Sequence, residues 1–314
     1  MVGARRRRQG TGPFVASCLT RAGATVCGIV GTSRSTVDVA RQELGDCFNI
    51  NCQGYTSLKE ALATEKPDIL AICSPFEMHL DALEKAAEYG VHCLCEKPLW
   101  WDSRRQKIEK TTKILNTFQD KKRFLQTITQ WPYTLPYFFK IYPKENFNTV
   151  TRFDMELSPR EDKEMMIPDS IPHLLSMLYA LVGYGKVENA QVQRIHEERK
   201  GWKISFLYKA DKTEVETTLR LVPVEKPPRP AAYAINGQKI RRRIILPDYT
   251  FAFDANGQCR AIEDPLELLI GDFLEKVYSQ TQLDFESLYC GMESMEVLVA
   301  SIEGYMNSLP NATP

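Results

Sequence analysis

The sequence predicts an α/β protein with an N-terminal doubly wound parallel sheet and a C-terminal α+β domain whose open sheet is mostly antiparallel. Over roughly the first 125 residues, short apolar runs alternate with amphipathic segments of helix length, which is typical of βαβ units. Beyond that point the segments are longer and alternate apolar with polar residues, as strands do in a sheet with one solvated face.

The composition limits what such a fold does. The chain has 314 residues, 43% of them apolar and 25% charged, which suits one large or two ordinary globular domains. Its 40 Lys and Arg balance its 40 Asp and Glu, so no global field attracts nucleic acid or a membrane surface. No run of about 18 apolar residues is present, and no apolar stretch follows the N-terminal arginines as in a secretory signal. We therefore expect a cytoplasmic protein with no nucleic-acid or membrane partner.

The cysteines and histidines are typical of a protein from a reducing compartment without a metal site. The cysteine count of nine is odd, and no pair has C-x-x-C spacing. Several, such as Cys73, lie within apolar runs, which indicates buried free thiols of a reducing compartment. The four histidines form no ligand cluster, so no metal site is expected.

Serine and glycine residues define the helix ends of the first domain. Ser35 and Ser57 stand at N-cap positions, Glu60 completes a capping-box pattern with Ser57, and Gly45 and Gly90 follow the last turns. The predicted elements of this domain, residues 1–123, are strands 25–30, 68–73 and 91–95 and helices 13–21, 35–44, 57–64, 78–89 and 103–118.

A glycine-rich turn, with Gly3, Gly10 and Gly12, precedes the first helix. Such a turn brings backbone N–H groups close to a pyrophosphate, whose charge the helix N-terminus favours. The spacing is longer than G-x-G-x-x-G, so an ordinary turn is the alternative. Only two residues precede Gly3, so the expected strand is either stunted or begins upstream. The arginines at 5–8 either help to hold cofactor phosphate or form a solvated loop; a nucleic-acid patch fits their location less well.

The end of strand 25–30 carries Thr32, Ser33 and Arg34, and no carboxylate follows before Asp38. In dinucleotide-binding folds this position faces the adenine ribose, where Asp or Glu favours NAD and Arg accommodates the 2′-phosphate of NADP. We therefore predict a preference for NADP over NAD. The alternative is that Ser33 and Ser35 only cap the next helix while Arg34 points to solvent.

Residues 67–99 carry the most specific pattern. Ser74-Pro75 ends a buried strand, His79 follows, a helix crosses over, and the next strand ends in Glu96-Lys97-Pro98. In this order and spacing the sequence resembles the Gfo/Idh/MocA family, named for glucose–fructose oxidoreductase and inositol dehydrogenase. The resemblance implies a Rossmann domain that binds NAD(P) and a hydride transfer at a hydroxyl or carbonyl carbon of a sugar, cyclitol or related molecule.

The same resemblance assigns roles. Carboxyl ends of parallel strands form the ligand crevice of such sheets, which places Ser74, Pro75, Glu96 and Lys97 beside the cofactor. Lys97 is the expected catalytic residue, whose cation and exchangeable protons orient a substrate hydroxyl. Without the surrounding pattern, a lysine there would be an ordinary exposed turn residue. His79 either lines the cofactor or packs at the helix start.

The second domain is expected to span residues 124–314. Its terminal helices are candidates to pack back on the first domain. The predicted elements are strands 124–129, 149–156, 187–195, 203–209 and 213–222, a helix at 171–181, a proline-rich loop at 223–230, and helices at about 265–279 and 286–308.

Asp169 and His173 open the helix at 171–181 and share one helical face, being four residues apart. An imidazole titrates near pH 6.5, about right for a general acid or base. Members of the resembled family carry Asp-x-x-x-His here, which implies that His173 acts with Lys97 in proton transfer and that Asp169 supports it. The family's glycine-rich run before this Asp is replaced by residues 164–168, so the substrate pocket is less predictable.

Trp131 and Tyr133 fall where the family has an Asn/Tyr-Arg-Phe-x-Pro segment that lines the substrate, but no arginine is present. Aromatic rings suit the apolar face of a sugar and equally suit an interface core. The family's second-domain sheet commonly packs against a partner's, so a homodimer or higher homo-oligomer is expected.

Two rival functions remain. A non-catalytic NADP-binding sensor has no use for Lys97, Asp169 and His173 together. An S-adenosylmethionine methyltransferase shares the glycine turn but does not explain Glu96-Lys97-Pro98.

Overall fold

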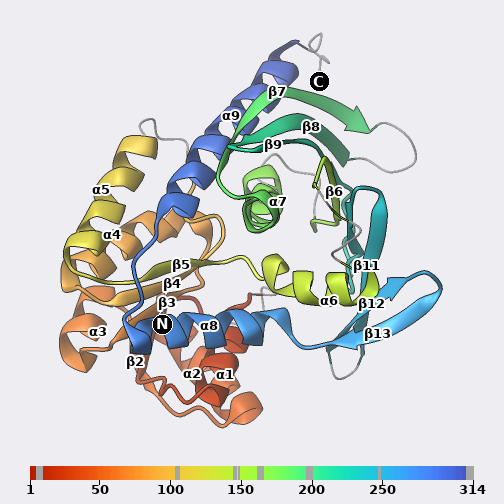
Figure 1. The fold of residues 1–314 in the computed structure, drawn as a ribbon. Coiled ribbons are helices and arrows are strands. Elements are labelled where there is room, and N and C mark those ends of the chain that lie inside the picture. Colours follow the sequence, from red (N-terminus) through yellow and green to blue (C-terminus); the bar gives the residue numbers. More distant parts are fainter. Residues whose placement is uncertain are drawn as a thin grey trace, which may run out of the picture. The chain divides into compact units, whose positions relative to one another are not determined.

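The computed structural model describes residues 1–4, 10–102, 107–143, 147, 149–160, 166–195, 201–246 and 249–308. The chain divides into two compact units, one of Met1–Thr129 with Leu266–Tyr289 and the other of Gln130–Pro265 with Cys290–Pro314. Figure 1 labels their elements along the chain. Within the described ranges, no helix is long and apolar enough to cross a membrane.

The first unit contains a parallel Rossmann-type sheet. Val2 joins its two ladders, because Val2 bridges Val30 on one side and Ile72 on the other, both in parallel. Val2 therefore occupies the place of a central strand between them. The ladders are β1 (Gly28–Val30) with β2 (Gln53–Tyr55), and β3 (Ile69–Ile72) with β4 (His92–Glu96) and β5 (Leu125–Ile128).

The helices of this unit follow the predicted alternation. Helix α8, from the C-terminal part of the chain, belongs here too, and Arg21 of α1 forms an ion pair with Glu267 of α8. The helices are α1 (Gly12–Arg21), α2 (Arg34–Phe48), α3 (Leu58–Glu65), α4 (His79–Tyr89), α5 (Lys107–Asp120) and α8 (Pro265–Ser279).

Two helix ends are confirmed and two, both of α2, are corrected. Ser57 Oγ caps α3 by accepting the Glu60 N–H, and Gly90 closes α4 in the left-handed region at φ +65°. The N-cap of α2 is Ser33 and not Ser35, because Ser33 is extended and exchanges capping-box hydrogen bonds with Thr36. Helix α2 also continues through Gly45.

The second unit contains an eight-stranded sheet in the order β13-β12-β11-β10-β6-β9-β8-β7. Strands β6 and β9 pair in parallel, and the other neighbouring pairs of this sheet are antiparallel. The strands are β6 (Arg152–Leu157), β7 (Gly185–Ile195), β8 (Gly201–Ala210), β9 (Thr213–Leu221), β10 (Ala231–Ile235), β11 (Gln238–Ile245), β12 (Thr250–Ala255) and β13 (Gln258–Ile262).

The predicted strands of this unit were right for β6 to β9 and incomplete beyond the proline-rich loop, and the strand predicted at residues 124–129 is present but belongs to the first sheet. Residues 125–128 form β5, which pairs in parallel with β4 in the first sheet. Strands β10 to β13 were missed, although Asn236-Gly237 and Asn256-Gly257 are hairpin turns with positive φ. Asn-Gly between two strands is a strong hairpin signal.

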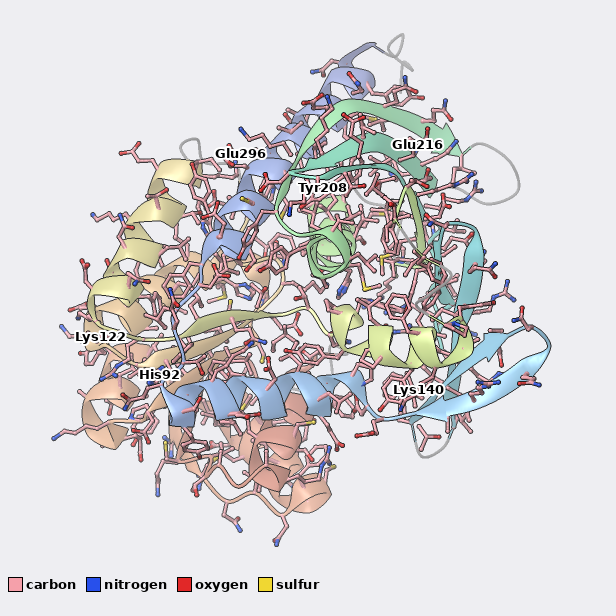
Figure 2. All side chains as sticks on the ribbon, viewed as in Figure 1. His92, Lys122, Lys140, Tyr208, Glu216 and Glu296 are labelled. Atoms are coloured by element: carbon pink, nitrogen blue, oxygen red, sulfur yellow. The ribbon has the colours of Figure 1, made fainter. Side chains whose placement is uncertain are left out.

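Helices pack on the inner face of this sheet, and strands such as β9 and β11 alternate buried with exposed side chains. Helix α7 contacts β6 and β9, and Tyr208 on β8 is buried and donates to the Gly183 carbonyl at the end of α7 (Figure 2). Glu216, on the opposite face of β9, is exposed. The helical segments here are the 3₁₀ turn η2 (Trp131–Thr134), α6 (Leu135–Ile141), α7 (Met166–Val182) and α9 (Glu286–Ser308).

Candidate functional site

Gly3 and Gly12 form a close backbone contact at the start of the first unit. Gly3 has φ +82°, and a Cβ there would lie 2.4 Å from the Cys73 carbonyl carbon. A Cβ on Gly12 would lie 2.1 Å from the Gly3 carbonyl oxygen. Only glycine fits at either position, and the N-terminus of α1 is thereby brought against the carboxyl end of Val2. Gly10 lies in the same loop, while the arginines at 5–8 lie outside the described residues.

Ser74 and Lys97 leave the parallel sheet at the same edge. Ile72 of β3 pairs in register with Cys95 of β4, and each chain turns two residues later. The Ser74 Oγ is shielded from solvent and has no hydrogen-bond partner among the described residues. A buried hydroxyl of this kind fits a cofactor that supplies the missing partner. The Lys97 N–H donates to Glu96 Oε2 at 3.2 Å, so the Glu96 side chain folds over the turn that carries Lys97.

His79 joins these two turns. The imidazole is fully buried, with Nε2 at 2.8 Å from the Ser74 carbonyl oxygen and Nδ1 at 3.0 Å from that of Pro98. The Leu99 carbonyl oxygen lies 3.2 Å from the same Nδ1. Both ring nitrogens face protein atoms, which supports packing over direct contact with a cofactor. Burial lowers the pKa of His79, and the three carbonyl contacts only partly oppose that effect.

Thr32, Ser33 and Arg34 follow β1 at the same edge of the sheet. Ser33 caps α2, which the alternative interpretation of this segment expected. The Arg34 side chain is 69% exposed, and its Nε lies 3.5 Å from Asp38 while Nη1 donates to the Gly54 carbonyl at 3.3 Å. The guanidinium is thus held near the end of β2 (Gln53–Tyr55) and remains accessible to a phosphate.

The second unit brings together Trp131 and His173. The Trp131 ring is 3% exposed and meets the His173 ring edge-on at 6.5 Å between centroids. Asp169 stands one helical turn before His173 on α7, and His173 is half-buried. Tyr233 packs against the other side of this cluster, at 6.0 Å from the Trp131 centroid. Tyr133 lies two residues after Trp131 in η2 and is half-buried.

Sequence reasoning missed Arg242, which also contacts Trp131. Its guanidinium carbon lies 5.3 Å from the Trp131 ring centroid. Burial, together with the nearby Arg229, lowers the pKa of Arg242 to about 10. The two-residue repeat of a strand could have revealed that Arg242 points inward. Arg242 shares its face of β11 with buried Ile240, while Arg241 and Arg243 point the other way.

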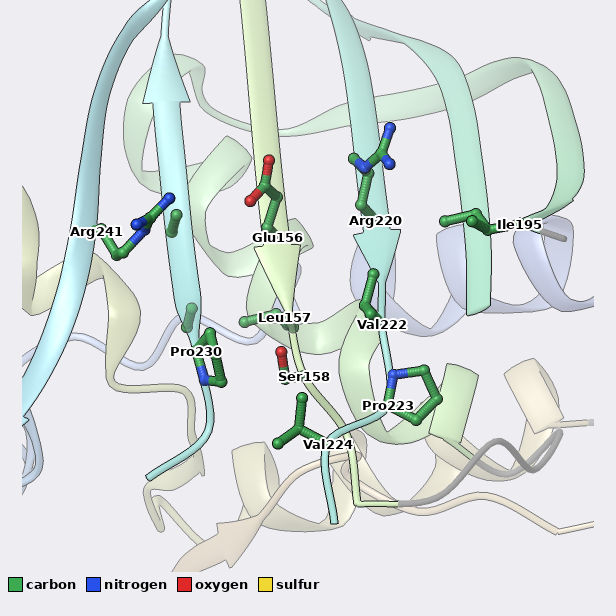
Figure 3. Close-up of a pocket in the computed structure, with 12 residues that line it drawn as sticks. Glu156, Leu157, Ser158, Ile195, Arg220, Val222, Pro223, Val224, Pro230 and Arg241 are labelled. Carbon is green, nitrogen blue, oxygen red and sulfur yellow. The ribbon is translucent and has the colours of Figure 1, made fainter. Parts of the chain in front are cut away.

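A cleft of about 980 Å³ lies on the outer face of the second unit's sheet (Figure 3). Glu156, Arg220 and Arg241 reach into it from β6, β9 and β11, and none of the site residues predicted from the sequence lines it. Its lower part is formed by the loop segments around Ser158 and Val224.

Comparison with known proteins identifies the first unit. Residues 3–128 match the model of the Gfo/Idh/MocA oxidoreductase family, described as an NAD-binding Rossmann fold. Over this segment the chain is similar to the Gfo/Idh/MocA family. The resemblance inferred from Ser74-Pro75 and Glu96-Lys97-Pro98 is thereby confirmed, as is the α/β fold class with its NAD-binding Rossmann domain. No curated protein sequence matches the chain.

Solved structures show that the likeness in fold extends beyond the Rossmann unit. Scyllo-inositol dehydrogenase from Lactobacillus casei, with bound NAD(H) and scyllo-inositol, has a TM-score of 0.71 at 13% identity over 97% of this chain and 96% of that one. UDP-N-acetylglucosamine 3-dehydrogenase from Acidithiobacillus ferrooxidans scores 0.69 at 18% identity, with 97% of each chain covered. An Agrobacterium radiobacter oxidoreductase in complex with NAD+, L-tartaric acid and magnesium scores 0.64 at 13% identity, over 97% and 95%.

Proposed function

We propose that this protein is an NAD(P)-dependent dehydrogenase or reductase that acts on a hydroxyl or carbonyl carbon of a sugar, cyclitol or related small molecule. The observation that carries the proposal is the pair of turns at Ser74-Pro75 and Glu96-Lys97, which leave one edge of an NAD-binding family's sheet side by side. Two of the similar structures are named as dehydrogenases of scyllo-inositol and of a UDP-sugar, which supports the substrate class.

The residues of the first unit fit a nicotinamide dinucleotide. Gly3 and Gly12 form a backbone cradle that a Cβ would fill, beside the N-terminus of α1, where a pyrophosphate is favoured. The orphaned Ser74 Oγ, with Pro75 and Glu96, would border the nicotinamide half, and His79 would hold both turns in place. Gly10 and Thr32 would complete the loop contacts. When bound, the nicotinamide accepts or donates the hydride.

The protein's own groups would manage the proton. In oxidation, the substrate carbon loses a hydride while its hydroxyl loses a proton, so a C=O bond forms and an acceptor for the proton is needed. We assign that role to Lys97 Nζ and the His173 imidazole together, with Asp169 orienting His173 from one turn earlier on α7. Trp131 and Tyr133 would line the substrate. In reduction the same groups return the proton to the carbonyl oxygen.

We propose a preference for NADP(H) over NAD(H). Arg34 is exposed, reaches back to the Gly54 carbonyl, and has no acidic residue immediately before it at the end of β1. A guanidinium in this place offers several N–H donors to a 2′-phosphate. Because the nearby Asp38 already partners Arg34, the 2′-phosphate gains less binding free energy from Arg34 than it would from an unpaired arginine.

We also propose that the protein forms a homodimer or higher homo-oligomer through the outer face of the eight-stranded sheet. Arg220, Arg241 and Glu156 stand together on that face (Figure 3). A two-fold contact would place each copy's arginines opposite the other copy's carboxylates, because such interfaces are self-complementary.

The catalytic proposal is tested by a panel of sugars, cyclitols and their oxidised forms with each nicotinamide cofactor, followed by two variants. Lys97→Met keeps much of the side-chain length without its charge, and His173→Asn keeps hydrogen bonding without titration near neutrality. Each should lower kcat by roughly 10²–10⁴-fold. NADPH should still bind within a few-fold of normal, and the His173 variant should lose one limb of the pH profile.

Three outcomes test the catalytic residues and the alternative function as a non-catalytic sensor. Near-normal turnover by both variants would show that Lys97 and His173 are not the proton-transfer groups. Tight NADPH binding without turnover of any panel member would support the sensor. A double variant whose loss equals that of one single variant would support joint action, because residues of one catalytic unit are non-additive.

A further inference from the structure

Arg242 is a largely buried cation that no acidic group among the described residues neutralises. Its Nη2 donates to the Arg229 carbonyl oxygen at 3.0 Å. Its Nε is shielded from solvent and has no hydrogen-bond partner within the same ranges. No carboxylate of those ranges forms an ion pair with it, and the charge that influences it is a second cation, Arg229.

Two other cations of the same strand, Lys239 and Arg243, are compensated by carboxylates. Lys239 Nζ lies 2.8 Å from Glu156, and Arg243 Nη2 lies 2.8 Å from Asp254, both on the exposed face of β11. Of these three cations, Arg242 is the one that points to the buried face. A buried charge is normally paired or hydrogen-bonded at every donor, because removal from water is costly. The Trp131 ring, at 5.3 Å, offsets only part of that cost.

The position of Arg242 connects it to the proposed chemistry. The Trp131 ring that it faces also meets the imidazole of His173, the proposed acid or base. The guanidinium and the imidazole therefore share one aromatic neighbour within the second unit. A guanidinium with a free donor edge binds carboxylate or phosphate oxygens through two parallel N–H donors.

We propose that Arg242 binds an oxyanion carried by the substrate, so that the preferred substrate is an acidic derivative of a sugar or cyclitol. The proposal rests on the proposed function, since it uses the same second-unit residues as the substrate site. The bound oxyanion supplies the partner that Arg242 Nε lacks, and it compensates the charge of Arg242. A carboxylate and a phosphate monoester share this chemistry.

Matched substrates and matched variants test the proposal. Glucose, glucuronate and glucose 6-phosphate are compared for turnover and, by calorimetry on the NADPH-loaded protein, for binding. The variants are Arg242→Met, Arg242→Lys and, as the control on the same strand, Arg243→Met. We expect the wild type to favour one acidic compound, and Arg242→Met to bind that compound roughly 10- to 100-fold more weakly, the range for one charge-assisted contact.

The loss should appear in KM and not in kcat, leave binding of glucose and NADPH unchanged, and be partly restored by Arg242→Lys. Arg243→Met should behave as wild type. A preference for glucuronate assigns a carboxylate, and a preference for glucose 6-phosphate assigns a phosphate. If Arg242→Met does not fold, the proposal is tested by the Arg242→Lys variant and by the comparison of neutral with acidic compounds on the wild type.

The two proposals fail differently. Turnover of glucose with equal affinity for all three compounds would overturn the anion site and leave the oxidoreductase function standing. Arg242-dependent binding of an acidic compound without any turnover would support the anion site and count against the catalytic function. Acidic compounds that bind equally to wild type and Arg242→Met would overturn the role of Arg242.

Discussion

At the residue scale, one buried imidazole connects the two turns of the proposed cofactor site. His79 faces the Ser74 carbonyl with one nitrogen and the Pro98 carbonyl with the other. Each of these turns follows its own strand, and the imidazole spans the gap between them. A side chain in this position holds the turns that carry Ser74 and Lys97 in a fixed relation to each other.

This imidazole should make the protein acid-sensitive. Burial lowers the pKa of His79 in the folded state below its ordinary value of about 6.5. Between those two pKa values the unfolded chain binds more protons, so the free energy of unfolding falls as the pH drops below about 6.5 and is recovered above it. Urea unfolding from about pH 7.5 to about pH 5.5 measures this slope.

The variant His79→Gln should flatten that slope, whereas His92→Gln should do so less. His92 is half-buried, accepts the Phe124 N–H at 2.9 Å and also has its pKa lowered by burial (Figure 2). An unchanged slope in His79→Gln would show that other groups cause the acid sensitivity.

Arg34 carries the prediction on cofactor choice. Arg34→Ala should weaken NADPH by about 1.5–3 kcal/mol, the range for hydrogen bonds to charged groups, and affect NADH much less. Fluorescence titration of both cofactors measures the difference. The prediction fails if the unmodified protein binds NADH more tightly than NADPH.

The residues of the proposed site were predictable from sequence to different degrees. Ser74, His79 and Lys97 follow strands whose apolar runs are unmistakable, so their common edge follows from the order of the strands along the chain. Arg242 could not be singled out, because its strand was not recognised and three consecutive arginines suggest a solvated surface. Arg242 differs from Arg241 and Arg243 only in that the alternation of side chains along the strand points it toward the buried face.

At the element scale, the helices of the first unit and its strands β1, β3 and β4 were predicted because local signals agree with the fold, whereas the three-residue strand β2 (Gln53–Tyr55) was not. Strands β10 to β13 were missed for physical reasons. β10 (Ala231–Ile235) is buried throughout and shows no alternation, and β11 (Gln238–Ile245) is dominated by cations that pair across the sheet. Strand β5 was assigned to the wrong sheet because a strand pattern does not say which partner it pairs with.

The glycine turn before α1 yields a prediction about an element. Gly12→Ala would place a Cβ against the Gly3 carbonyl oxygen, so α1 or the turn must shift. We expect a destabilisation of about 1–3 kcal/mol, typical of overpacking, and a marked loss of NADPH affinity. Thermal unfolding and fluorescence titration measure both effects.

Gly45→Ala is the matched control. Gly45 lies inside α2, and a Cβ there would come no closer than 4.0 Å to the Asn51 side chain. Alanine in a helix interior stabilises by roughly 0.5–1 kcal/mol over glycine, and NADPH binding should not change. Equal behaviour of the two variants would show that the Gly3–Gly12 contact does not form the cofactor turn.

At the scale of the whole molecule, the outer face of the second sheet determines how the protein can associate. Ion pairs cover it, including Lys239 with Glu156 and Lys209 with both Glu188 and Glu214. Beneath the first pair, β10 contributes alanines, which let Lys239 reach across to β6. This face is polar, so copies that pack through it are held by complementary charges more than by apolar burial.

The proposed homodimer should therefore be sensitive to salt and to charge reversal. Arg220 and Arg241 are exposed, and no ion pair of theirs occurs within the described ranges, so each is available to a partner's carboxylate. Light scattering at tens of micromolar should show a dimer at low ionic strength that weakens toward about 1 M salt, where screening acts within about 3 Å. Arg220→Glu should weaken it further, whereas Arg260→Glu, on the distal strand β13, should not. A monomer at low salt would refute the association, and a dimer indifferent to both salt and Arg220→Glu would place its interface on another surface.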